Sequence, residues 1–134
     1  MRPALGLLVA LPLAGCLAPT PDAAAPPPLS DAQVVSFTVA SACIGRGAPL
    51  EATLALRNPG GGAGRASVGV YAQQYGYVAQ ADVDLGAHET RNVTLRGSID
   101  LPGRWTLFAQ GPRVMAGQAS VTVLDPDDPG SRCP

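Results

Sequence analysis

The feature that most constrains the fold is an alternation of apolar and polar residues, which recurs along most of the chain after its first thirty residues. In one such segment every second residue is apolar: Leu50, Ala52, Leu54 and Leu56. A period of two places successive side chains on opposite faces of an extended chain, so one face can be buried while the other is solvated. The pattern therefore predicts half-buried β-strands.

Seven segments follow this pattern, at residues 32–40, 50–57, 65–73, 77–85, 89–96, 104–110 and 117–124. In the first of them we expect Val35, Phe37 and Val39 to face the interior. The chain also contains 16 Gly and 14 Pro, which disfavour long helices and form turns between the segments. Short strands at this spacing are typical of all-β folds. We therefore expect one antiparallel β-sandwich of immunoglobulin-like type.

Two stretches of the predicted sandwich carry a family resemblance. The strand at 50–57 is followed by Asn58-Pro59-Gly60, and the next strand contains Val68, Val70 and Tyr71. The later stretch LPGRWTLFA (101–109) places Trp105 at its aromatic position. These features resemble the bacterial CARDB-type and related immunoglobulin-like repeats. The resemblance implies a sandwich over about residues 34–124, and an adhesion, scaffold or accessory role with no catalytic activity.

The first sixteen residues resemble the leader of a bacterial lipoprotein. A positively charged start, Met1-Arg2-Pro3, precedes a ten-residue apolar run. Such a run is too short to span a bilayer but has the length of a signal-peptide core. It ends in Leu13-Ala14-Gly15-Cys16, which resembles the lipobox. We expect residues 1–15 to be a signal peptide and Cys16 to carry diacylglycerol; the alternative is an ordinary secretory leader.

A lipid on Cys16 would make the membrane the first partner of this chain, because several acyl chains together hold a protein durably on a bilayer. Leu17 follows the cysteine, where an Asp would resemble an inner-membrane retention signal, so the outer membrane is favoured in a Gram-negative source. Residues 16–30 are rich in Pro and Ala, which predicts an extended or disordered tether. The sandwich is expected over 31–126 and a tail over 127–134.

Two cysteines remain after Cys16. An exported protein lies where disulfides persist. In a sandwich of this type the first strand can run parallel to the last, which would bring Cys43 and Cys133 to the same end. We therefore expect a disulfide between them; two free thiols are the alternative. Two cysteines alone do not form a zinc ligand set, so no metal is expected there.

The sequence offers little for catalysis or for cofactors. His88 is the single histidine and falls in an expected turn, and no GxSxG motif supplies a nucleophile. Asp82 and Asp84 alternate on a strand and are expected to face solvent. The acidic tail DPDDPG could contact calcium, but a solvated tail is the simpler interpretation. The formal net charge of −1 argues against nucleic-acid binding, and we expect no cofactor and no enzymatic activity.

The candidate partner-binding residues are three tyrosines in one short stretch, Tyr71, Tyr75 and Tyr77. Tyrosine is enriched at interfaces because it buries a large area and keeps a polar tip. The alternative is that these rings only cover the edge of a hairpin. We expect a lipid-anchored envelope module that binds a protein or polysaccharide. The second hypothesis is an accessory or inhibitor protein that acts on an envelope enzyme.

Overall fold

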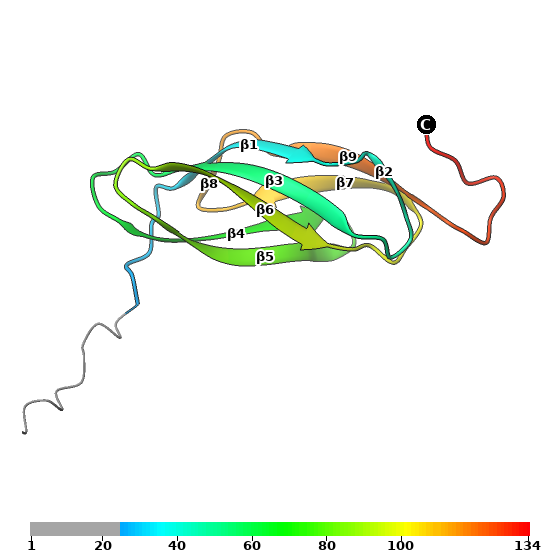
Figure 1. Cartoon of the computed structure of the whole chain (residues 1–134), viewed down its shortest axis with the longest axis horizontal. Coiled ribbons are helices and arrows are strands. Elements are labelled where there is room, and N and C mark those ends of the chain that lie inside the picture. Colours follow the sequence, from blue (N-terminus) through cyan, green and yellow to red (C-terminus); the bar gives the residue numbers. More distant parts are fainter. Residues whose placement is uncertain (1–24) are drawn as a thin grey trace, which may run out of the picture.

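The computed structural model describes residues 25–134, which form two β-sheets packed face to face (Figure 1). The four-stranded sheet has the spatial order β6 (Thr90–Gly97), β3 (Leu50–Arg57), β1 (Gln33–Val39), β8 (Arg113–Val114). The five-stranded sheet has the order β2 (Cys43–Gly45), β9 (Gln118–Leu124), β7 (Gly103–Gln110), β4 (Gly64–Ala72), β5 (Gly76–Leu85). The expected all-β, immunoglobulin-like sandwich is confirmed.

The expected signal peptide and Cys16 lie outside the described residues. Between residues 25 and 134, no helix has the length and apolar character needed to cross a membrane.

The seven expected strands are present, and two short ones join them. The first strand of the chain is divided between the sheets, because β1 pairs with β3 whereas β2 crosses over and runs parallel to β9. The second addition, β8, runs parallel to β1. Strands of two or three residues carry too little periodicity to be found in a sequence.

The core lies between the sheets and is built from the predicted inward positions. Leu54 of β3, Leu107 of β7 and Val121 of β9 have no exposed surface. Burying a side chain of this size contributes about 1.5–3 kcal/mol. The alternation therefore sets which face of most strands turns inward.

One inward assignment was wrong. A register shift between Val34 and Ser36 marks a β-bulge in β1, where an extra residue changes the phase of the alternation. Val34 is consequently buried, with no exposed surface, while Val35 is only partly buried. Phe37 keeps its expected place in the core.

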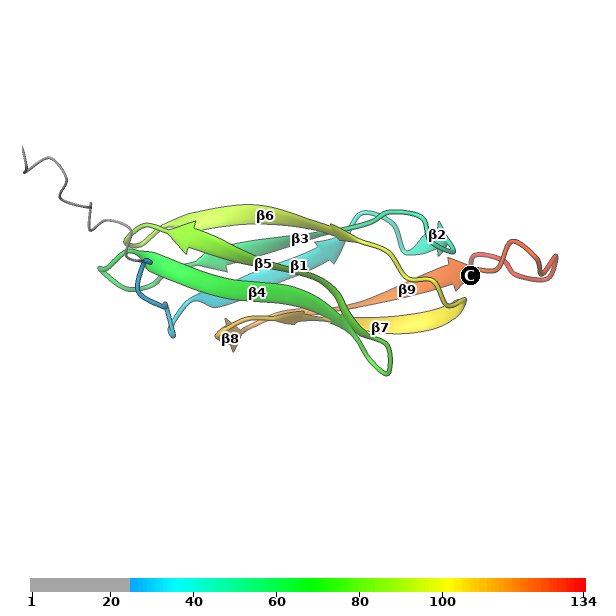
Figure 2. The ribbon, with the colours of Figure 1, turned by 90° about the horizontal axis from the view of Figure 1, so that it is seen from below.

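One end of the sandwich, which we call the turn end, holds the loops that follow β3 and β5 and the incoming chain (Figure 2). Asn58 is the buried polar residue among those described, with 1% of its surface exposed. Its amide nitrogen donates to the carbonyls of Gly62 and Gly86, and its Oδ1 accepts from the Gly60 N–H. The Asn58 side chain thus ties two loops together in place of backbone pairing.

The incoming chain is also fixed at the turn end. Residues 27–29, which the sequence places in the tether, lie along the edge of β4. The Arg65 N–H donates to the Pro27 carbonyl, and the Leu29 N–H donates to the Arg65 carbonyl. Gly64 permits this approach, because a Cβ atom there would collide with the Pro27 carbonyl and the Leu29 side chain. Two backbone hydrogen bonds therefore fix the chain on the sheet before the first full strand.

Candidate functional site

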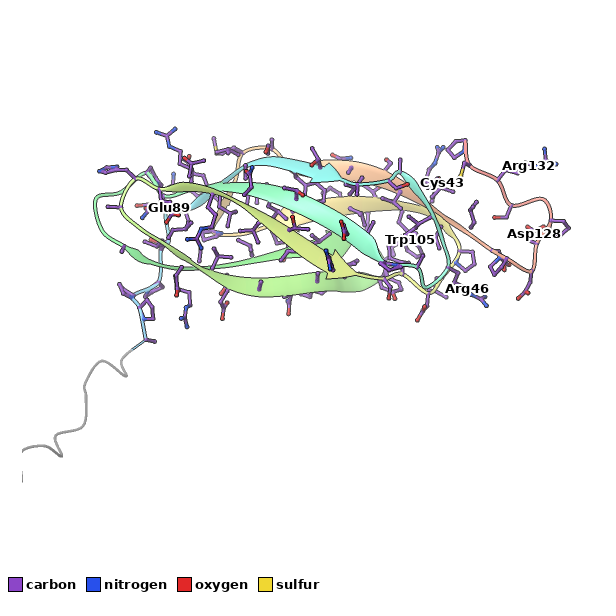
Figure 3. All side chains as sticks on the ribbon, in the orientation of Figure 1. Cys43, Arg46, Glu89, Trp105, Asp128 and Arg132 are labelled. Carbon is purple, nitrogen blue, oxygen red and sulfur yellow. A yellow bond between two sulfur atoms is a disulfide. The ribbon has the colours of Figure 1, made fainter. Side chains whose placement is uncertain are left out.

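The opposite end, which we call the disulfide end, carries the covalent link. Cys43 and Cys133 form a disulfide with their Cα atoms 5.7 Å apart, which confirms the expected pairing. Because β2 runs parallel to β9, Cys43 lies beside the tail that follows β9 (Figure 3). The tail folds on itself, and the Asp125 N–H donates to the Ser131 hydroxyl at 2.9 Å. The pair is a structural clamp.

The acidic tail makes ion pairs with the protein itself. The Arg46 guanidinium lies 4.0 Å from an Asp125 carboxylate oxygen and 3.8 Å from one of Asp127. Across residues 25–134, no three His, Cys, Asp or Glu side chains gather closely enough to hold a metal ion. The geometry of the tail thus favours charge pairing with Arg46.

The three tyrosines separate into two groups. Tyr71 and Tyr77 lie on neighbouring strands, with ring centroids 5.5 Å apart and planes at 80°. Tyr75 instead packs its ring edge against Trp105, and its hydroxyl accepts a long hydrogen bond from the Asp100 N–H at 3.4 Å. Tyr75 thus covers the core at the disulfide end, whereas Tyr71 and Tyr77 remain candidates for partner contact.

Tyr71 and Tyr77 belong to a row of aromatic side chains on the outer surface of the five-stranded sheet. In the strand register, Tyr71 of β4 lies between Tyr77 of β5 and Phe108 of β7. The row faces away from the core, since the neighbours of Tyr71 along β4, Val70 and Ala72, are buried. We call the surface formed by Tyr71, Tyr77 and Phe108 the tyrosine face.

An open groove lies beside the tyrosine face, with a volume of about 500 Å³. Its main lining residues come from β4, β5 and β7, and we call it the Gly69 groove: Ser67, Gly69, Tyr77, Gln80, Asp82 and Gln110. In the register, Gly69 lies between Gln80 and Gln110. The groove crosses the strands directly next to the aromatic row.

Hydrogen bonds between side chains order this surface. The Tyr77 hydroxyl donates to Gln110 Oε1 at 2.6 Å, which joins β5 to β7 across β4. The Ser67 hydroxyl donates to Asp82 Oδ1 at 2.6 Å. These two hydrogen bonds link the tyrosine ring and the groove wall to the neighbouring strands.

An ion pair closes the polar end of the same surface. The Arg65 Nε donates to Asp84 Oδ1 at 2.8 Å. This hydrogen bond, reinforced by the opposite charge, holds the pKa of Asp84 below its usual value and raises the pKa of Arg65. Both groups stay charged at neutral pH and are occupied with each other. Asp82 and Asp84 face solvent, as the alternation predicts.

His88 lies in the turn between β5 and β6, exposed and with a φ of 56°. Its N–H donates to the Gly60 carbonyl, so its backbone helps to close the turn end. The structure thus places His88 in the expected turn.

Sequence reasoning missed most of the groove. Gln80 and Gln110 are thirty positions apart in the chain, and only the pairing of β4 with β7 brings them together. Gly69 did offer a signal, because a glycine inside a regular strand often marks a close approach of a ligand or of another chain segment.

Comparison with solved structures identifies the architecture. The CARDB domain of a Pyrococcus furiosus protein, solved in complex with di-metal ions, superposes with a TM-score of 0.55. The match covers 69% of this chain and 92% of that domain, at 20% sequence identity. The fold is CARDB-like.

The chain also superposes on parts of larger enzymes. A β-glucosidase from Erythrobacter marinus superposes with a TM-score of 0.60 at 17% identity, over 70% of this chain and 15% of the enzyme. The alkylpurine DNA glycosylase AlkC of Pseudomonas fluorescens, bound to DNA, gives 0.51 at 16% identity, over 69% and 30%. At these identities the matches establish the fold alone. No protein-family model and no curated protein matches the chain in sequence.

Proposed function

We propose that this protein is a lipid-anchored binding module of the cell envelope with no catalytic activity, and that its tyrosine face contacts the partner. The main support for this proposal is the pair of rings, Tyr71 and Tyr77, on the outside of the sheet. Tyr77 keeps 54% of its surface exposed although its hydroxyl is fixed by Gln110. An ordered, exposed aromatic ring can bind without losing further side-chain entropy.

The anchor in this proposal rests on the resemblance of Leu13-Ala14-Gly15-Cys16 to a lipobox. The course of the described chain supports a directional arrangement. Residues 27–29 enter at the turn end, while Cys133 is bonded to Cys43 at the opposite end (Figure 3). An anchor at Cys16 would therefore hold the turn end toward the membrane and leave the side of the sandwich, with the tyrosine face, open to a partner.

The binding part of the proposal can be tested by site-specific crosslinking in intact cells. Benzoylphenylalanine replaces Tyr77 in one variant of the full-length protein and Thr94, exposed on the other sheet, in a matched control. We expect light-dependent adducts from position 77 and none from position 94. Adducts that form equally from both positions, or from neither, would contradict the tyrosine face as the contact surface.

The anchor is tested separately. Mass spectrometry of the mature protein should show a diacylglyceryl-modified Cys16, and the Cys16→Ser variant should leave the membrane fraction. An unmodified cysteine in membrane-purified protein would overturn the anchor.

A further inference from the structure

We propose that the Gly69 groove binds a neutral polysaccharide chain. The inference rests on the proposed function and specifies the chemistry of the partner. It follows from four properties of the groove: its floor, its hydrogen-bonding groups, its aromatic wall and its charge.

The floor of the groove depends on Gly69. A Cβ atom at this position would lie 3.0 Å from the Ala79 carbonyl, 3.4 Å from Gln80 Cγ and 3.6 Å from the Tyr77 ring. Any other residue would therefore occupy the space directly between the side chains that line the groove. Because Gly69 has no side chain, a ligand can approach the peptide groups of β4 closely.

The walls of the groove supply amides and hydroxyls. Gln80 and Gln110 flank Gly69 from the two neighbouring strands. Each side-chain amide carries two N–H donors and a carbonyl acceptor, a set that matches the hydroxyl groups of a sugar, which both donate and accept. Gln110 uses its Oε1 for the Tyr77 hydroxyl, and among residues 25–134 its amide nitrogen has no hydrogen-bond partner, so it can donate to a ligand.

The aromatic wall suits a sugar ring as well. Tyr77 is 54% exposed, and its ring is positioned by Tyr71 on one side and by Gln110 at its hydroxyl. The face of an aromatic ring carries negative charge density, which attracts the weakly positive C–H groups of a pyranose. A ring next to paired amides can thus satisfy both the apolar and the polar sides of a sugar.

The charge of the groove selects against acidic ligands. Asp82, an acidic residue, is the charged residue among those that line it. The nearby Arg65 is paired with Asp84 at 2.8 Å. An acidic polysaccharide would therefore meet repulsion without a free cation to offset it. The open shape of the groove, about 500 Å³ in volume, also suits one stretch of a chain.

A protein partner fits this groove less well. The core of a protein interface is apolar and depleted of charge. The exposed large hydrophobic residues among those described are Tyr77, Leu101, Val114 and Met115. Of these only Tyr77 lines the groove. The polar lining thus favours hydroxyl-rich ligands over an apolar protein surface.

The test is calorimetric titration of the protein with neutral linear hexasaccharides, namely oligomers of β-1,4-glucose, β-1,3-glucose, α-1,4-glucose and β-1,4-N-acetylglucosamine. Hexagalacturonate is the acidic comparison. We expect at least one neutral hexamer to bind with a Kd between about 10 μM and 1 mM, and hexagalacturonate to bind at least about tenfold more weakly.

Two variants and one control locate the binding. Gln80→Ala should weaken the binding of the neutral hexamer about tenfold by removing hydrogen bonds. Gly69→Val should abolish its binding by filling the floor of the groove. Gln80 is exposed, so its substitution keeps the test valid even if Gly69→Val fails to fold. Thr94→Ala, on the other sheet, should leave the affinity unchanged.

Failure of all four neutral hexamers to bind at about 10 mM would overturn the inference, as would binding that Gln80→Ala leaves unchanged. Tighter binding of hexagalacturonate would also overturn it. Specific crosslinks from position 77 to a protein, together with no sugar binding, would reject the polysaccharide but keep the proposed binding module. Loss of both signals would reject the two proposals together.

Discussion

The two ends of the sandwich are closed by different chemistry. At the disulfide end, Cys43 and Cys133 join the crossing strand β2 to the tail after β9. At the turn end, the Asn58 amide and hydrogen bonds to the incoming residues 27–29 hold the loops together. Figure 3 shows Glu89 and Cys43 at these opposite ends. The stability of the disulfide end thus depends on redox state. The stability of the turn end depends on buried hydrogen bonds and, through Glu89, on pH.

The largest effect is expected from the disulfide. Replacing Cys43 and Cys133 with Ser should lower the free energy of unfolding by about 2–4 kcal/mol, because the closed loop spans a separation of 90 residues. For a domain of this size the melting temperature should fall by about 10–25 °C. Thermal unfolding, monitored by circular dichroism, measures this change in melting temperature. A reductant should destabilise the wild type and leave the double-serine variant unchanged; equal melts of the two proteins would contradict the clamp.

Asn58→Ala should destabilise the turn end by about 2–3 kcal/mol, because it leaves the Gly62 and Gly86 carbonyls and the Gly60 N–H without their partner. Urea unfolding measures the loss, which should not change with reductant. Because the ends are distant, the Asn58 and cysteine effects should add. A coupling energy well above about 0.5 kcal/mol in the combined variant would show that the two ends are not independent.

Gly64→Ala should release residues 27–29 from β4 and cost about 1 kcal/mol, since two backbone hydrogen bonds are lost. Hydrogen exchange of the Leu29 amide reports this release directly, and the protection of that amide should fall. Gly62→Ala is the matched control in the neighbouring loop, because a Cβ atom there meets nothing within 4 Å. Unchanged protection of Leu29 in Gly64→Ala would contradict the docking of the incoming chain.

The smallest effect concerns pH. The Gly86 N–H donates to Glu89 at 2.7 Å, and this bond, helped by Arg91, holds the Glu89 pKa below its ordinary value of 4.5. The folded state therefore binds this proton less readily than the unfolded state. The stabilisation is present above pH 4.5 and is lost as pH falls through the lower folded value. Urea midpoints should drop less for Glu89→Gln than for the wild type between pH 5 and pH 3; parallel profiles would reject the contribution.

The same comparison shows why the ends differed in how far they could be predicted. The disulfide was expected, because the leader predicts export and because a first strand parallel to the last would bring Cys43 and Cys133 to the same end. The Pro and Gly residues between the strands predicted a turn after residue 57, but the partners of the Asn58 amide, Gly62 and Gly86, could not be known. Gly86 belongs to a loop 28 positions away, and no local pattern specifies such a contact.

The candidate site, like the two ends, was only partly predictable from the sequence. The sequence pointed to Tyr71, Tyr75 and Tyr77 as one group because they are close in the chain. The turn of the β4–β5 hairpin removes Tyr75 from that group and directs it to Trp105. Strand register then brings Phe108 and Gln110 to the tyrosine face from a distant segment. Proximity in the chain was therefore a poor guide to proximity on the sheet.

The sequence by itself determined the class of fold and the inward face of most strands. Alternation and turn residues act locally, and burial of one face follows from them. The tertiary structure alone decided the order of the strands, the crossing of the first strand between sheets and the Gly69 groove. These depend on which strands lie side by side, and that choice is made by packing over the whole core.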